Sequence, residues 1–366
     1  MISTGSLTID LKAIKNNWQL LNKHLGKVAC GAVVKANAYG LGAVPVAQAL
    51  VAAGCETLFV ATMAEAVEIR EQVVAKYQLV VLGGMAHSRY ADCVHYGIVP
   101  VLTENRHLSL WAESCRSAGQ RWPCIVKVDT GMHRFGLSPK EIHTHLDDPH
   151  LLNQCSPMML MSHLACADNP EAPLNTRQLT VFVSIVDKVR ALLPTIKASL
   201  VNSAGIFLGP QYFFDMARPG IALYGGNPTP YRVNPMQSVV SLHLPINQVR
   251  VVHDGDSVGY GGEFVAIGDK KIATVFGGYA DGLPRYLGGR GYGYYRGYRV
   301  PIAGRVSMDA TAFDISAVPD NQLSVAPGVI EILGEHHSID QLACEANTIS
   351  YELLTPLGNR FQRVYK

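Results

Sequence analysis

Residues 32–42 read AVVKANAYGLG, a stretch in which one lysine, Lys35, stands where an apolar β-rich run ends and a glycine-punctuated turn begins. A lysine ordinarily has a pKa of about 10.4 and belongs in water. At the mouth of an apolar strand the neutral amine is favoured, and a neutral amine is what reacts with an aldehyde to form a Schiff base. Lys35 alone is also compatible with a strand-end lysine that reaches solvent. The stretch therefore predicts either a reactive amine or an ordinary strand end.

The composition is that of a large globular protein. The chain has 366 residues, of which 48% are hydrophobic and 16% are charged, so it can bury a large core and is expected to form two domains. The low fraction of charged residues indicates a large interior or a sizeable subunit interface. A formal net charge of +2 gives no reason to expect nucleic acid as a partner, and no apolar run reaches membrane-spanning length.

The eight cysteines include no C-x-x-C pair and no zinc-like array, so we expect reduced thiols in the core and no metal site. Reduced thiols are typical of cytosolic proteins. The N-terminus also lacks the basic and then apolar pattern of a secretion signal. The sequence thus predicts a soluble, cytoplasmic protein.

Up to about Tyr231, short apolar runs alternate with helical patterns. Eight alternations predict an α/β fold, a (β/α)8 barrel of the TIM type over residues 1–231. An open doubly wound sheet is the alternative, weakened because no G-x-G-x-x-G run follows the first strand. The expected strands are Cys30–Lys35, Leu58–Ala61, Leu79–Leu82, Ile98–Leu102, Cys124–Asp129, Met158–His163, Ser199–Asn202 and Gly220–Tyr224.

Three helices between these strands have clear signals. Thr62–Glu65 is a capping box before a helix that ends near Lys76, and Ser138–Glu141 offers an N-cap serine, a proline and a glutamate in the right order. Thr176–Leu193 has the apolar spacing of an amphipathic helix. Each such helix would cover one side of the barrel.

After Tyr231 the helical periodicity fades, and residues 232–366 are predicted to form a mostly β C-terminal domain. Its expected strands are Val239–His243, Lys271–Phe276, Arg299–Val306, Thr311–Ile315 and Gly328–Leu333.

Polar residues gather at the ends of the expected barrel strands, where barrel enzymes place their active sites. Ser203–Gly205 and Arg218–Ile221 have the composition of turns that cradle a phosphate, and Arg218 just precedes the eighth expected strand. The other strand-end polar residues are Lys35, Asp129, Arg134, His163, Asn202 and Tyr224.

These motifs, in this order, resemble those of alanine racemases over nearly the whole chain. The resemblance implies a pyridoxal-phosphate-dependent enzyme that interconverts L- and D-alanine, built as a barrel plus a β domain and assembled as a head-to-tail homodimer. It also implies that a first short strand, Leu7–Leu11, lies on the side of the β domain. The matching segments are Ala32–Gly42, Lys127–Gly136, Ser162–Ala165, Asn202–Gly205, Ala217–Gly225, Gly259–Gly261, Gly278–Gly282 and Gly304–Asp309.

The resemblance also implies roles for single residues. Lys35 would bond the cofactor and act as one base, and Tyr260 of the partner subunit would be the other. Lys127 would be a carbamylated lysine paired with Arg134. The remaining cofactor contacts would be Tyr39, His163, Asn202, Ser203, Arg218, Gly220, Ile221 and Tyr351, and the substrate contacts would be Arg134, Tyr279, Met308 and Asp309.

The chemistry explains why these residue types suit the reaction. Racemisation removes a proton from one face of Cα and returns one to the other, so two bases on opposite faces are needed. Arg218, placed by the resemblance opposite the pyridine nitrogen, can only donate, which keeps that nitrogen unprotonated and the ring a weaker electron sink. An Arg218–His163–Tyr260 chain would give the tyrosine base a cationic neighbour. Related decarboxylases carry a carboxylate at the position of Arg218, which favours the racemase.

Other interpretations remain open at this point. A broad-specificity amino-acid racemase would use the same two bases with a roomier pocket, and a non-catalytic pyridoxal-phosphate-binding protein would resemble the barrel alone. Without the resemblance, Tyr260 is best explained as a hairpin tyrosine and His163 as a core histidine. The sequence does not decide between supply of a peptidoglycan precursor and alanine catabolism.

Overall fold

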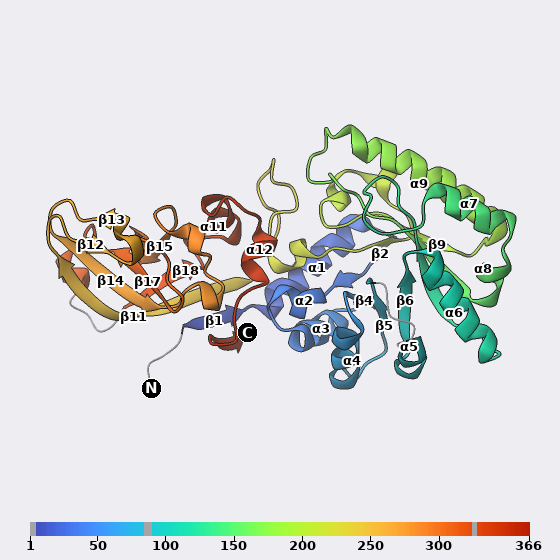
Figure 1. Ribbon diagram of the computed structural model, residues 1–366, viewed down its shortest axis with the longest axis horizontal. Coiled ribbons are helices and arrows are strands. Elements are labelled where there is room, and N and C mark those ends of the chain that lie inside the picture. The colour runs from blue at the N-terminus through green and yellow to red at the C-terminus, as the bar shows by residue number, and fades with distance from the viewer. Residues whose placement is uncertain (1–4, 84–89, 324–327) are drawn as a thin grey trace.

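The computed structural model describes residues 5–83, 90–323 and 328–366, which form an α/β domain and a mostly β domain lying side by side (Figure 1). Residues 1–4 and 84–89 of the expected barrel segment lie outside the described residues. The α/β domain is built on seven parallel strands that are paired in chain order. They are β3 (Ala32–Val33), β4 (Thr57–Val60), β5 (Gln78–Val81), β6 (Ile98–Leu102), β7 (Pro123–Lys127), β8 (Ser156–Met161) and β9 (Lys197–Ser199).

The expected eighth strand, Gly220–Tyr224, is wrong. Residues Ile221–Tyr224 form the 3₁₀-helix η4, and the strand lies earlier, at β10 (Met216–Ala217), which pairs with β2 (Ala29–Cys30). A fully buried apolar run has no periodicity to separate a strand from a helical turn. Pro219 also cannot donate to a sheet, which ends β10 at this point.

This correction also changes the position of Arg218. Arg218 directly follows β10, at the carboxyl end of the strand, rather than preceding a strand. Hydrogen bonds from Asp215 N to Ala198 O (2.9 Å) and from Arg218 N to Val201 O (3.0 Å) join the β10 segment to the β9 segment. Together with the β2–β10 pair they complete the ring, so the predicted barrel is confirmed with a different eighth strand.

Two of the three predicted barrel helices begin where the sequence predicts, whereas α9 (Pro173–Leu192) begins three residues before the expected Thr176. Both capping boxes form, at Thr62 and Glu65 before α4 and at Ser138 and Glu141 before α7, although α4 ends before the expected Lys76. Within the described residues, no helix has the length and apolar character needed to cross a membrane. The helices of this domain are α1 (Leu11–Leu25), α2 (Lys35–Tyr39), α3 (Ala43–Ala52), α4 (Met63–Gln72), α5 (Tyr90–Tyr96), α6 (Asn105–Ser117), α7 (Pro139–Asp147), α8 (His150–Gln154) and α9 (Pro173–Leu192).

The second domain is a β sheet that takes one strand from each end of the chain. Strand β1 (Ser6–Ile9) pairs antiparallel with β11 (Val240–Val252) and parallel with β19 (Gln362–Tyr365). The first strand therefore belongs to this sheet, as the resemblance implies. The other elements are β12 (Ser257–Val258), β13 (Phe264–Val265), β14 (Lys270–Phe276), β15 (Tyr292–Tyr295), β16 (Tyr298–Pro301), β17 (Ala310–Asp314), β18 (Val329–Leu333), α10 (Asp320–Leu323), α11 (Ile339–Glu345) and α12 (Ser350–Leu354).

Candidate active site

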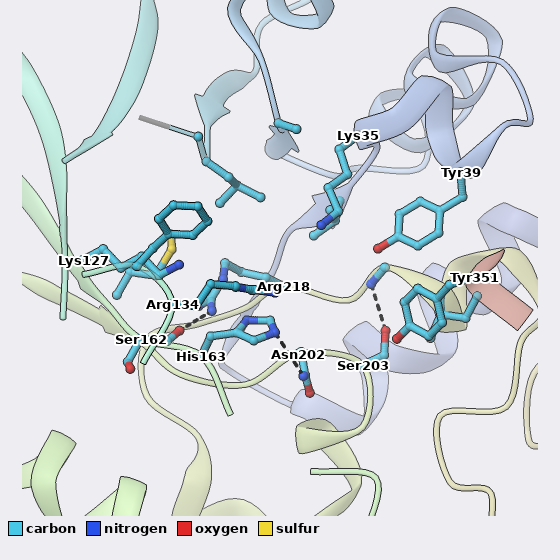
Figure 2. A pocket seen from close by; sticks show the side chains of 18 residues that line it. Lys35, Tyr39, Lys127, Arg134, Ser162, His163, Asn202, Ser203, Arg218 and Tyr351 are labelled. Atoms are coloured by element: carbon cyan, nitrogen blue, oxygen red, sulfur yellow. Dashed lines mark hydrogen bonds between the residues drawn. The ribbon is translucent and has the colours of Figure 1, made fainter. Parts of the chain in front are cut away.

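A cavity of about 470 Å³ lies at the carboxyl ends of the barrel strands (Figure 2). Lys127 is the last residue of β7, and Arg218 follows β10 directly. Tyr351 reaches the cavity from α12 of the β domain. The cavity brings together these residues singled out from the sequence: Lys35, Tyr39, Lys127, Arg134, His163, Asn202, Ser203, Arg218, Gly220, Ile221 and Tyr351.

Lys35 opens an unusual turn. The four residues that follow it, Ala36 to Tyr39, all have left-handed backbone angles, with φ between 52° and 55°. This conformation costs a residue other than glycine roughly 1–2 kcal/mol. Gly40 ends the turn at φ 84°, where a Cβ atom would lie 2.3 Å from Leu354 O. The turn directs the side chains of both Lys35 and Tyr39 toward the cavity (Figure 2).

The cavity concentrates positive charge. Burial and the nearby Arg134 guanidinium lower the pKa of Lys35, whereas the Glu65 carboxylate raises it. Burial, together with Arg218 and Arg134, lowers the pKa of Lys127 to about 8. Such a site attracts anions and favours the neutral form of each amine.

Arg218 is buried without a carboxylate partner among its hydrogen bonds in the described residues. Its guanidinium donates to Ser199 Oγ, to Ser162 O at 2.5 Å and to Leu200 O at 3.5 Å. Burial lowers its pKa to about 9. A buried cation held only by neutral acceptors is suited to face an electron-rich atom of a ligand.

His163 lies beside Arg218 but is joined to it indirectly. In the described residues, the His163 ring accepts a hydrogen bond from Asn202 Nδ2, at 3.5 Å. Arg218 instead donates to the carbonyl of the preceding residue, Ser162. Burial, followed by the charge of Arg218, lowers the pKa of His163 to about 3. The imidazole is therefore neutral at pH 7.

One end of the cavity has the features of a phosphate site. Ser203 Oγ accepts hydrogen bonds from Gly220 N (2.8 Å) and Ala222 N (3.3 Å). A Cβ atom at position 220 would lie 2.2 Å from the Tyr39 hydroxyl, so only glycine leaves this space open. Tyr351 stands at the same end, with its ring 5.8 Å from that of Tyr39. Hydroxyls, main-chain N–H groups and open space suit an anionic group.

Four residues to which the resemblance gives a role lie outside this cavity, as do the strand-end residues Asp129 and Tyr224. Tyr260 begins the turn between β12 and β13, at the end of the molecule remote from the barrel, and is 71% exposed (Figure 1). Tyr279 and Met308 are also exposed, and their segments are joined by the hydrogen bond from Ala280 N to Met308 O (3.1 Å). Asp309 pairs with Arg360 at 2.7 Å. The chain therefore does not bring these four to its own cavity.

Seven further residues of the cavity wall were not singled out from the sequence, and all of them except Ser162 are apolar or glycine. Most of these residues stand at or just after the carboxyl end of a barrel strand, so the same strand-end rule would find them. Apart from Ser162, their side chains have no group that could bind a ligand through a charge or a hydrogen bond, so the sequence offers no reason to select them. They are Val33, Ala61, Leu82, Gly83, Phe135, Met161 and Ser162.

Fold and cavity together define a class of protein: an α/β-barrel enzyme with a lysine beside an anion-binding site at the carboxyl ends of its strands. In residues 5–83, 90–323 and 328–366, no group of three or more His, Cys, Asp or Glu side chains is placed to hold a metal ion. Residues 9–228 match the family described as "Alanine racemase, N-terminal domain" and residues 239–365 match "Alanine racemase, C-terminal domain". The chain belongs to the alanine racemase family.

Individual relatives agree with this assignment over nearly their full length. An alanine racemase of Rhodospirillum rubrum is 46% identical over 364 residues, which cover 99% of this chain and 96% of the relative. A catabolic alanine racemase of Mesorhizobium japonicum is 43% identical, covering 98% and 92%. The crystal structure of alanine racemase from Bartonella henselae with covalently bound pyridoxal phosphate has a TM-score of 0.92 at 35% identity, covering all of both chains. The biosynthetic alanine racemase of Pseudomonas aeruginosa has a TM-score of 0.90 at 33% identity, covering 100% and 99%.

Proposed function

We propose that this protein interconverts L- and D-alanine by a two-base mechanism, with Lys35 on one face of the substrate and the partner subunit's Tyr260 on the other. Membership of the alanine racemase family establishes the reaction, racemisation of alanine, and the cofactor, pyridoxal phosphate. The residue assignment rests mainly on one observation: a half-buried lysine, a buried guanidinium and a recess beside Ser203 and Gly220 all lie in one cavity. The roles of the single residues are the proposal.

The residues of the cavity fit the cofactor. When bound, pyridoxal phosphate bonds the amino group of the substrate and delocalises the negative charge left at Cα. Tyr39, Ser203 and Tyr351, with the main chain at Gly220 and Ile221, would hold the phosphate. Beside them, Asn202 would hold the His163 ring in place.

At the opposite end of the cavity, Arg218 would face the ring nitrogen and hold it unprotonated, because its own nitrogens can only donate. Arg134, an exposed residue that lines the cavity, would orient the carboxylate of the substrate. The lowered pKa of Lys35 favours the neutral amine, which is the form that would accept the Cα proton.

A homodimer would complete the site. Tyr260, Tyr279 and Met308 are exposed on the β domain, together with the carboxylate of Asp309. We propose that they line the substrate entrance of the partner subunit. The exposure of large apolar side chains in this set supports an interface.

We also propose a cytoplasmic location. Six of the eight cysteines are buried, which agrees with the expected core thiols, whereas Cys166 is half-buried and Cys344 is exposed. Buried thiols that form no disulfide are typical of a reducing compartment. Fractionation of the producing cells, with detection of the chain by antibody, tests the location.

The substrate specificity is tested by incubating the purified holoenzyme with a panel of free L-amino acids. The D-form of each amino acid is then measured by chiral chromatography. Alanine is expected to exceed every other substrate in kcat/KM by about tenfold or more, because an added methylene costs about 1–3 kcal/mol in a tight pocket. Comparable rates for larger amino acids would instead support the broad-specificity racemase.

Carbamylation of Lys127 gives a separate prediction. With a pKa of about 8, roughly a tenth of the Lys127 amines are neutral at pH 7, and only the neutral amine adds carbon dioxide. The neutral fraction of the Lys127 amine grows as the pH rises through 8. We therefore expect kcat/KM to depend on added bicarbonate most strongly below pH 8. Removing carbon dioxide at pH 7 should lower kcat/KM several-fold and bicarbonate should restore it, whereas Lys127→Met should show neither effect. A wild-type enzyme indifferent to bicarbonate would contradict the modification.

A further inference from the structure

We infer that Glu65 is a positioning residue for Lys35: its carboxylate holds the left-handed turn that presents the Lys35 amine to the cavity. The sequence assigns Glu65 only to the capping box of α4. The inference rests on the proposed role of Lys35 and adds a residue to it.

The contacts of the carboxylate reach beyond its own helix. Glu65 Oε2 accepts hydrogen bonds from Ala61 N (2.8 Å) and Thr62 N (3.2 Å), which completes the cap of α4. Glu65 Oε1 instead accepts from Ala36 N, at 2.7 Å. Ala36 directly follows Lys35, so one carboxylate joins the start of α4 to the first peptide of the turn. Hydrogen bonds to a charged acceptor are about twice as strong as neutral ones.

The turn needs such support. Ala36, Asn37, Ala38 and Tyr39 all adopt the left-handed conformation, which persists only where the surroundings enforce it. The far end of the turn is held by Arg363, whose Nη1 donates to Gly40 O at 2.7 Å. Glu65 holds the near end, which is the end that carries Lys35.

Glu65 also acts on the amine through its charge. The cations facing Lys35 from the other strand ends are Arg134 and Lys127, and His163 nearby is neutral at pH 7. Glu65 is the one acid among the groups that shift the pKa of Lys35 within the described residues, and it raises that pKa. Removing the charge of Glu65 therefore lowers the pKa of Lys35 further.

The chain contains two matched controls for this carboxylate. Glu141 has the same place in the capping box of α7, where Oε2 accepts from Ser138 N (2.7 Å), and it does not line the cavity. The capping box of α11 uses a glutamine, Gln341, whose Oε1 accepts from Ser338 N (2.9 Å). Glutamine therefore supports a cap in this protein, and Glu65→Gln is expected to fold.

The experiment compares Glu65→Gln with Glu141→Gln in the holoenzyme. Both variants should lose a similar, small amount of thermal stability. Glu65→Gln alone should weaken pyridoxal phosphate retention by about tenfold, measured as the dissociation constant in equilibrium dialysis, since a charged hydrogen bond next to Lys35 is lost. It should also move the Lys35-dependent limb of the kcat pH profile to lower pH, because kcat reports the complex in which the substrate has displaced the Lys35 amine from the cofactor.

Two outcomes would overturn the inference. If Glu65→Gln matches Glu141→Gln in cofactor retention and pH profile, Glu65 only caps α4. If Thr62→Val, which weakens the same cap but leaves the Ala36 contact, lowers cofactor retention as much as Glu65→Gln, the effect comes from α4 itself. Failure of the proposed function is distinguishable, because it would appear in the wild-type enzyme as absent racemisation or as cofactor bonded elsewhere than at Lys35.

Discussion

Replacing Lys35 by alanine is expected to abolish the covalent attachment of pyridoxal phosphate and to lower racemisation by about 10³-fold or more. The substitution removes both the amine that bonds the cofactor and one of the two proposed bases, and a positioned base alone contributes about 10²–10⁴-fold. Borohydride reduction of the wild-type holoprotein, followed by peptide mass analysis, should find the cofactor on Lys35. The variant should carry no adduct.

A control variant and a stability measurement separate this loss from misfolding. Lys76→Ala, at an exposed position, should keep the adduct and the activity. The pKa of Lys35 is lowered in the folded protein, so folding disfavours its charged form at any pH below that lowered value. This destabilisation disappears as the pH rises toward the unfolded value of 10.5. Without cofactor at pH 7, Lys35→Ala should therefore unfold at the same temperature as the wild type or higher. An adduct that moves to Lys127, the other amine with a lowered pKa, would contradict the assignment.

The barrel is largely predictable from the sequence because its strands are buried on both faces and read as short apolar runs. Ile98–Leu102 matches β6, and Leu58–Ala61 lies one residue from β4. Gly220–Tyr224 has the same appearance but forms a 3₁₀-helix, since an apolar run shows burial and not backbone conformation. The expected strand would place Arg218 at its amino end, whereas the observed β10 places Arg218 at a carboxyl end, together with the other residues of the cavity.

A site residue can be predicted from the sequence where its side chain is able to take part in binding or proton transfer and where it stands at the carboxyl end of an expected strand. Lys35, His163 and Asn202, which end three of the expected strands, satisfy both conditions. The left-handed turn is not predictable, because Ala36 and Ala38 are residues that avoid this conformation in isolation. The contact of Glu65 with Ala36 depends on how α4 packs against the turn, and local sequence contains no information on that packing.

Replacing Tyr260 by phenylalanine is expected to suppress removal of the Cα proton from one enantiomer of alanine by about 10²–10⁴-fold. Removal from the other enantiomer should be far less affected, because Lys35 still serves the opposite face. The rates of proton removal from the two enantiomers are distinguished by measuring exchange of the Cα hydrogen in deuterated water separately for L- and D-alanine. Tyr298→Phe, another exposed tyrosine of the β domain, is the control and should leave both rates unchanged. Equal loss for both enantiomers would refute the two-base scheme.

As the proposed second base, Tyr260 would have to act on a second chain. It lies between β12 and β13, at the end of the molecule remote from the cavity that contains Lys35 (Figure 1). Mixing Lys35→Ala chains with Tyr260→Phe chains should therefore restore activity, since each heterodimer holds one site with both native bases. Random exchange makes half of the dimers mixed, with one competent site in two, so about a quarter of the wild-type rate is expected. If heterodimers form, as shown by native mass spectrometry, and no activity returns, both bases must come from one chain.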